Sequence, residues 1–130
     1  MITAIYASVL ALLMCGLAYN VIKARRKNKI RYADGNVEEL QIARTAHSNS
    51  VDYIPITLIL IFILEYNGAN IWLIHLAGLS LIIGRIIHCK GILSESLKGR
   101  VLGMKITFFT IFALAFLNLL YAPYEKLLLF

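Results

Sequence analysis

The sequence predicts an all-α membrane protein with four transmembrane helices arranged as an up-down bundle. The composition is 60% hydrophobic, the mean hydropathy is +0.77, and four apolar runs are separated by short polar segments. Soluble domains are far less apolar, and a membrane span needs about 20 apolar residues. Because the 130 residues contain no linker and no low-complexity tract, we expect a single four-helix domain covering residues 1–130.

The first apolar run, residues 2–22, carries no charge, and basic residues follow it instead of preceding it. This order is unlike that of a cleavable signal peptide, so we expect a retained transmembrane helix. Small side chains recur along the run at three- and four-residue steps, and small residues let helices approach closely in lipid. We therefore expect helix or subunit contacts on the face made by Ala4, Ala7, Ser8, Ala11, Cys15 and Ala18.

The second run, residues 51–66, is short for a span. We expect its helix to extend back through residues 38–49, which contain no Gly or Pro, with Gly35 or Asn36 as the start signal. Pro55 lies inside this helix and cannot donate a backbone hydrogen bond. A bend at Pro55 is therefore expected.

The third and fourth runs, residues 71–89 and 101–122, contain the charged residues Arg85 and Lys105. A charge within a transmembrane helix is costly and normally faces a polar cavity or a partner. Residues 67–70 between the second and third runs include an Asn-Gly pair, which predicts a tight turn. Three short connections between four helices predict the up-down order.

The basic residues are concentrated in the first and third connections: Lys23, Arg25, Arg26, Lys27, Lys29, Arg31, Lys90, Lys98 and Arg100. Short loops rich in Lys and Arg stay in the cytosol, so we expect both termini outside. This topology accounts for the formal net charge of +6 better than nucleic-acid binding does, because the charges lie beside the spans.

In an up-down bundle, the basic connections and the helix ends beside them share one face. The candidate site residues expected at this face are Arg25, Arg26, Arg44, His47, Asn49, Asp52, Arg85, His88 and Arg100. Asp52 can pair with Arg85 or Arg44, which leaves other arginines for lipid phosphates, water or an anionic ligand. Convergent arginines suit a small peptide with two carboxylates, and glutathione is such a molecule. The His spacing does not indicate a metal site.

The sequence resembles the MAPEG family, the membrane-associated proteins in eicosanoid and glutathione metabolism. The resemblance covers nearly the whole chain and is carried by residues 24–26, 44–55, 65–68, 84–88 and 99–103. It implies a homotrimer of four-helix subunits that binds glutathione as co-substrate between neighbouring subunits. The compact length resembles the bacterial branch, which implies an inner-membrane location with the glutathione site facing the cytosol.

The resemblance also implies residue roles. Asn49 and Asp52 match the family's glutathione-binding Asn and Glu, and Arg100 matches an arginine that stabilises the thiolate. The implied glutathione-binding set is Arg25, Arg26, Arg44, His47, Asn49, Asp52, Tyr53, Arg85 and His88, with Arg100 as the catalytic residue. The chain departs from the family pattern at Asp52, where Glu is usual, at Thr45, where Arg is usual, and at Ile92, where eicosanoid-forming members carry Tyr.

The expected function is that of a membrane glutathione transferase, with glutathione peroxidase activity as an option, acting on lipophilic electrophiles. A non-catalytic glutathione- or lipid-binding scaffold protein on the same fold stays open because of these departures. A small multidrug exporter is disfavoured, because such exporters use an acid within a helix and the first run has none.

Overall fold

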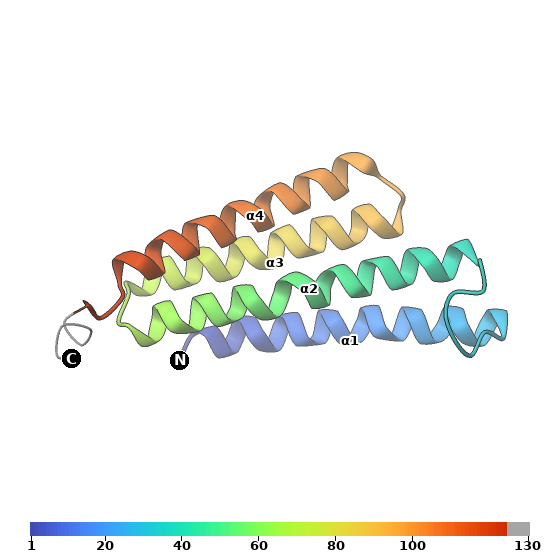
Figure 1. Cartoon of the computed structure of the whole chain (residues 1–130), viewed down its shortest axis with the longest axis horizontal. Coiled ribbons are helices and arrows are strands. Elements are labelled where there is room, and N and C mark those ends of the chain that lie inside the picture. The colour runs from blue at the N-terminus through green and yellow to red at the C-terminus, as the bar shows by residue number, and fades with distance from the viewer. Residues whose placement is uncertain (125–130) are drawn as a thin grey trace.

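The computed structural model describes residues 1–124, which form four α-helices. These are α1 (Thr3–Asn28), α2 (Glu38–Tyr66), α3 (Ile71–Leu93) and α4 (Leu97–Leu120). All four are long and apolar enough to cross a membrane. They lie side by side in alternating directions, so the N-terminus and the end of α4 share one end of the bundle (Figure 1). The predicted fold class is confirmed, while residues 125–130 of the predicted domain lie outside the described residues.

The long second helix is confirmed, because α2 extends well before its apolar run and continues through Pro55. Its start differs from the prediction. Gly35 and Asn36 both adopt left-handed backbone, with φ near +57°, and belong to the preceding turn. Val37 is the residue that precedes the helix. In this turn the N–H of Asn36 donates to the Asp34 carboxylate at 3.0 Å, which lowers the pKa of Asp34 below its ordinary value.

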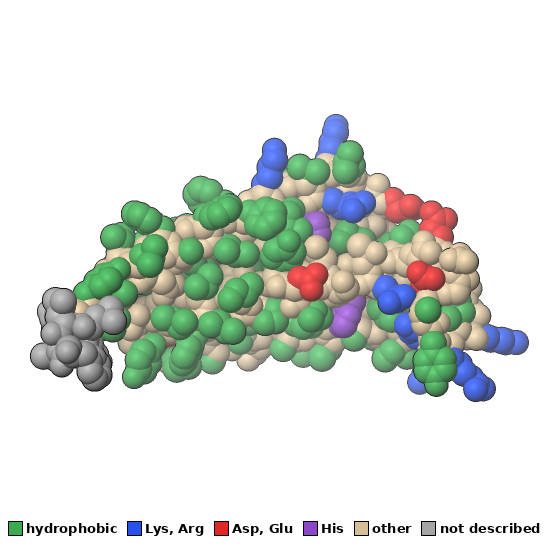
Figure 2. All heavy atoms as spheres, viewed as in Figure 1, with side chains coloured by type: hydrophobic (Ala, Val, Ile, Leu, Met, Phe, Trp, Pro, Cys, Tyr) green, Lys and Arg blue, Asp and Glu red, His purple; other side chains and the backbone are tan. Residues whose placement is uncertain are grey.

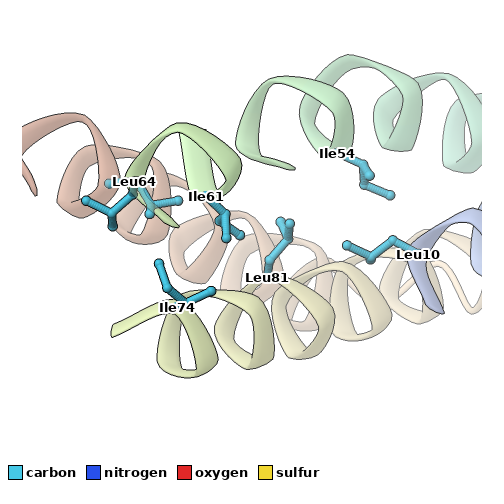
Figure 3. Packing of buried hydrophobic residues seen from close by; sticks show 7 residues of the cluster. Leu10, Ile54, Ile61, Leu64, Ile74 and Leu81 are labelled. Carbon is cyan, nitrogen blue, oxygen red and sulfur yellow. The ribbon is translucent and has the colours of Figure 1, made fainter. Parts of the chain in front are cut away.

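The apolar core lies between the helices toward the end that carries the termini. Its fully buried members come from all four helices, and Figure 3 labels six of them: Leu10, Ile54, Ile61, Leu64, Ile74 and Leu81. Lipid tails are as apolar as these side chains, so burial from lipid gives little driving force. The core therefore stabilises the bundle through close van der Waals packing.

The small-residue face of α1 does not take part in this packing. The buried face of α1 is made instead by Thr3, Tyr6, Leu10, Leu17 and Ala24. Most of the predicted small-residue face, including Ala4, Ser8 and Cys15, is exposed in the single chain. Contacts of α1 within the chain are therefore made by another face, and the expected contact of the small-residue face with a neighbouring subunit stays a prediction.

Helices α3 and α4 pack with their backbones in close approach. A methyl group placed on Gly103 would overlap the backbone nitrogen of His88. A methyl group on Gly91 would likewise overlap the backbone nitrogen of Arg100. Glycine is required at both positions because nothing larger fits between the two helices.

Glu65 at the end of α2 caps the N-terminus of α1. Its carboxylate accepts hydrogen bonds from the backbone N–H of Ile2 and from both the N–H and the hydroxyl of Thr3, the Thr3 N–H at 2.8 Å. The first N–H groups of a helix have no partner within the helix. Because Ile2 offers no side-chain cap, Glu65 supplies it from the neighbouring helix.

Candidate functional site

Charged side chains are unevenly distributed along the bundle. In Figure 2, Lys, Arg, Asp, Glu and His side chains gather over the half of the visible face away from the N-terminus, whereas the other half is covered by hydrophobic side chains. This is the end of the two basic connections, between α1 and α2 and between α3 and α4. The polar face predicted from the sequence is therefore present in the fold.

Arg85 of α3 is the central residue of this region, because its side chain has no solvent exposure at all (0%). Its Nη2 donates to Oδ1 of Asn49 at 2.7 Å and to Oγ of Ser50 at 3.4 Å. Its guanidinium carbon lies 5.8 Å from the centre of the Tyr53 ring, within the range of a cation–π contact. The other two nitrogens, Nε and Nη1, have no hydrogen-bond partner.

The predicted ion pairs of Asp52 do not form. Among residues 1–124, neither Arg85 nor Arg44 has an oxygen of Asp52 within 4.0 Å of its guanidinium. Asp52 is on an exposed face of α2. Arg44 instead lies 3.9 Å from Asp34 in the preceding turn. The amide of Asn49, one helical turn before Asp52, contacts Arg85 in place of a carboxylate.

His88 lies one turn beyond Arg85 and is also buried. Its Nδ1 is 2.7 Å from the carbonyl oxygen of Arg100 in α4, across the helix pair joined at Gly103. A carbonyl can only accept, so Nδ1 carries the hydrogen. In the neutral ring Nε2 is then an acceptor, and it has no partner. The site thus contains unpaired donor groups on Arg85 and one unpaired acceptor on His88.

The remaining predicted residues lie outside this cluster. Arg25 is partly exposed and donates to the carbonyl of Arg31 at 3.4 Å. Arg26 and the Arg100 side chain are exposed, and His47 is partly buried. In the single chain the structure therefore brings together Asn49, Tyr53, Arg85, His88 and the backbone of Arg100, and leaves Arg25, Arg26, Arg44, Asp52 and the Arg100 guanidinium on open surfaces.

Ser50 belongs to this cluster although the sequence did not single it out. Its Oγ contacts Arg85 and lies 3.2 Å from Sγ of Cys89. Cys89 shares the Arg85 face of α3, a relationship that four-residue spacing does predict. The contact of Ser50 with Arg85 depends on how α2 packs against α3. In the sequence, the one indication of this contact was that Ser50 follows Asn49.

Four membrane-crossing helices with a buried guanidinium toward one end define a multi-pass membrane protein with a polar site near one membrane face. The model of the MAPEG family matches residues 3–120, and the chain belongs to this family. It is therefore a membrane protein related to glutathione and eicosanoid metabolism.

Curated relatives agree with the membrane assignment. The chain is 36% identical over 125 residues to the Inner membrane protein YecN of Escherichia coli strain K12, covering 96% of this chain and 95% of the relative. The protein of the same name from Escherichia coli O6:H1 strain CFT073 matches with the same values. Together with the four apolar helices, these relatives identify a multi-pass inner membrane protein.

Proposed function

We propose that this protein is a membrane glutathione transferase that joins the glutathione thiolate to lipophilic electrophiles, with the site on the cytosolic side and both termini outside. The observation that carries the proposal is the Arg85 guanidinium, which is fully buried and keeps Nε and Nη1 without partners. Membership of the MAPEG family supports glutathione as the ligand.

A buried cation needs an anion or several polar partners. Among residues 1–124 no carboxylate oxygen lies within 4.0 Å of Arg85, and Asn49 and Ser50 supply only neutral oxygens. An anionic ligand beside the Asn49–Tyr53 stretch of α2 would balance this charge. Glutathione brings two carboxylates and a thiol that can ionise.

The ligand also needs a surface of polar side chains to bind against, and α2 has one. Arg44, Ser48 and Asp52 follow one another at four-residue steps on an exposed face. Side chains with this spacing share one side of a helix. We place one glutathione carboxylate toward Arg85, the other toward Arg44, the ammonium group toward Asp52, and the peptide groups toward Asn49.

The α2 face made by Arg44, Ser48 and Asp52 is exposed in the single chain, so a neighbouring subunit has to enclose the ligand from the other side. The exposed small-residue face of α1 supports such a contact, because small residues allow close helix approach in lipid. We propose the homotrimer that the family resemblance implies. The further glutathione-binding residues in this assembly are Arg25, Arg26, His47, Tyr53 and His88.

Arg100 is the proposed catalytic residue. A thiol with pKa ~8.5 is only a few per cent ionised at pH 7, and lowering it by about two units takes roughly 2.7 kcal/mol of preferential thiolate stabilisation. An exposed guanidinium near the start of α4 can turn toward a ligand, and an arginine in a partly desolvated pocket can supply this energy. The thiolate sulfur then bonds to the electrophilic carbon, and the leaving group departs.

The test compares purified wild type, Arg100→Ala and Lys98→Ala. Lys98 is a matched control, since it is also an exposed cation in the first turns of α4. Thiolate absorbance on adding glutathione should rise for wild type and Lys98→Ala and fall by about tenfold or more for Arg100→Ala. Equal thiolate formation in all three proteins would remove Arg100 from the role.

A non-catalytic glutathione-binding scaffold is the second candidate. The contact of Arg44 with Asp34 favours it, because a carboxylate of the chain already partly occupies this arginine. Calorimetry with glutathione and a turnover assay with chlorodinitrobenzene separate the two. Binding without turnover favours the scaffold, whereas binding with turnover supports the transferase.

A further inference from the structure

The imidazole of His88 joins α3 to α4 at Arg100, the proposed catalytic residue. His88 is only 5% exposed, and its Nδ1–H donates to the carbonyl oxygen of Arg100 at 2.7 Å. Arg100 lies in the first turn of α4, where its own N–H donates to the carbonyl of Ser96 at 3.1 Å. A buried side chain of α3 therefore holds the backbone of the residue whose guanidinium is proposed to meet the thiol.

Close packing of the two helices also confines the backbone of Arg100. A methyl group on Gly91 would overlap its nitrogen, so the backbone of α3 passes directly against this residue. One turn further along α4, a methyl group on Gly103 would overlap the backbone nitrogen of His88 itself. The two glycines thus bring the helices near enough for the imidazole to reach the Arg100 carbonyl.

The side chain of Arg100 is restrained much less than its backbone. Arg100 is exposed and makes no ion pair with a carboxylate of residues 1–124. The cap of α4 adds little, because the Gly99 N–H donates to Oγ of Ser96 at 3.4 Å, which is longer than a typical hydrogen bond of this kind. The point from which the guanidinium extends therefore depends on how firmly the first turn of α4 is held against α3.

We propose that His88 is a positioning residue, which fixes the start of α4 through the Arg100 carbonyl and so sets where the Arg100 guanidinium meets the ligand thiol. This role rests on the proposed function, in which Arg100 stabilises the thiolate. Such stabilisation requires groups that are already in place, and a displacement of about 1 Å can cost about a hundredfold in rate. The role belongs to Nδ1 of His88 and does not involve Nε2.

Two substitutions of His88 separate the roles of its two ring nitrogens. In His88→Asn the side-chain NH2 takes a place close to that of Nδ1, so a donor to the Arg100 carbonyl is retained. In His88→Gln the amide lies one methylene further out, close to the place of Nε2, so this hydrogen bond is lost. Ser80→Ala is the matched control, because it removes a different hydrogen bond between α3 and α4, the one of 2.7 Å to Thr110.

The first experiment follows the backbone of the full chain in detergent, without glutathione. Hydrogen–deuterium exchange is read by peptide mass spectrometry over residues 97–104. Exchange there should be at least about threefold faster in His88→Gln than in wild type, since one lost hydrogen bond shifts a local opening equilibrium by about this factor or more. His88→Asn and Ser80→Ala should exchange at nearly the wild-type rate. Equal exchange in wild type and His88→Gln overturns the proposal.

The wild-type protein alone gives a check that does not depend on whether a variant folds. NMR of isotope-labelled histidine distinguishes the two neutral tautomers of the ring, and the hydrogen bond to the Arg100 carbonyl requires the hydrogen of His88 on Nδ1. A neutral His88 ring with its hydrogen on Nε2 overturns the proposal.

The second experiment measures thiolate absorbance at saturating glutathione, expressed per glutathione bound in calorimetry. The thiolate signal should fall at least about threefold in His88→Gln, whereas His88→Asn should keep most of it and Ser80→Ala should keep all of it. A role of His88 through Nε2 alone predicts the reverse order of the two His88 variants. A signal in His88→Asn equal to or below that in His88→Gln therefore overturns the proposal.

Including Arg100→Ala separates a failure of this role from a failure of the proposed function. A loss of thiolate in Arg100→Ala without any loss in His88→Gln overturns the positioning role and leaves the transferase in place. Absence of thiolate in the wild type defeats the transferase function, and the exchange rates and the His88 tautomer then still decide whether His88 fixes the start of α4.

Discussion

The two ends of the bundle solve the same problem of burying polar groups in opposite ways. Toward the termini, the Glu65 carboxylate accepts hydrogen bonds from Ile2 and Thr3 and follows Leu64 of the apolar core. At the other end, Arg85 and His88 are buried with three nitrogen atoms that have no partner, whereas the terminal end has one such atom among the described residues, Oδ1 of Asn118. Unsatisfied buried polar groups are costly. The comparison teaches that the first end meets most of its polar groups within the chain, whereas the second leaves more of them unpaired, as the proposed ligand site requires.

The largest effect should come from the backbone contact that joins α3 to α4. In Gly103→Ala the new methyl group overlaps the backbone of His88 and cannot move aside, so the helices must separate. We expect a loss of about 3 kcal/mol in the free energy of unfolding, at the upper end of overpacking costs. Thermal unfolding in detergent measures it.

Gly16→Ala is the matched control, because a methyl group there meets no atom within 4 Å. It should leave stability unchanged or raise it by up to about 1 kcal/mol through better helix propensity. If both glycine variants unfold alike, the close approach of α3 and α4 is not what holds this end together.

The apolar core should give the next largest effect. Leu81→Ala leaves a cavity among fully buried side chains, which typically costs about 2–5 kcal/mol. We expect about 2 kcal/mol, because lipid replaces water in the surroundings and mainly packing is lost. The melting temperature should fall for Leu81→Ala and stay near that of wild type for Leu12→Ala, whose side chain is exposed. Equal shifts in the two variants would contradict the assigned core.

Arg85→Met sharpens the contrast between the two ends, since it should weaken binding without weakening the fold. Replacing a buried ion pair by apolar side chains of similar size is often neutral or stabilising by about 1–4 kcal/mol, and Arg85 has no ion pair among residues 1–124 that the change would break. We expect a gain near 1 kcal/mol together with a loss of glutathione affinity of about tenfold, or about 1.4 kcal/mol. Calorimetry and thermal unfolding of the same preparation test both, and a destabilised variant with unchanged affinity would reverse the assignment.

The smallest effect should come from the cap on α1. Glu65→Gln keeps the shape but removes the negative charge and replaces one of the two oxygens that accept from Ile2 and Thr3 with an NH2 group, which cannot accept. A helix cap is worth about 1 kcal/mol, so a loss of that size is expected in thermal unfolding. Glu95→Gln, an exposed acid in the connection between α3 and α4, is the control and should change little. A Glu65→Gln protein as stable as wild type would show that α1 is held by packing alone.

Several site relationships follow from spacing along single helices. Arg85, His88 and Cys89 lie three and four residues apart, so their common face follows from helical geometry. That Asn49 and Asp52 lie about one turn apart on α2 was predictable in the same way. The partner of Arg85 was not: the sequence suggested Asp52, but the rotation of α2 exposes that carboxylate and presents Asn49 and Ser50 instead. A rotation of this kind depends on the packing of two helices together.

Hydropathy and the spacing of charges were enough to establish the four spans, the up-down order and the clustering of basic groups at one end, because each depends on local composition. The sequence alone could not say that the small-residue face of α1 is exposed, that the glycines of α3 and α4 meet, or that Arg85 makes no ion pair with a carboxylate of residues 1–124. Only the tertiary structure decided these points. Helix rotation in a membrane is set by side-chain contacts between helices, since the surrounding lipid does not favour one apolar face over another.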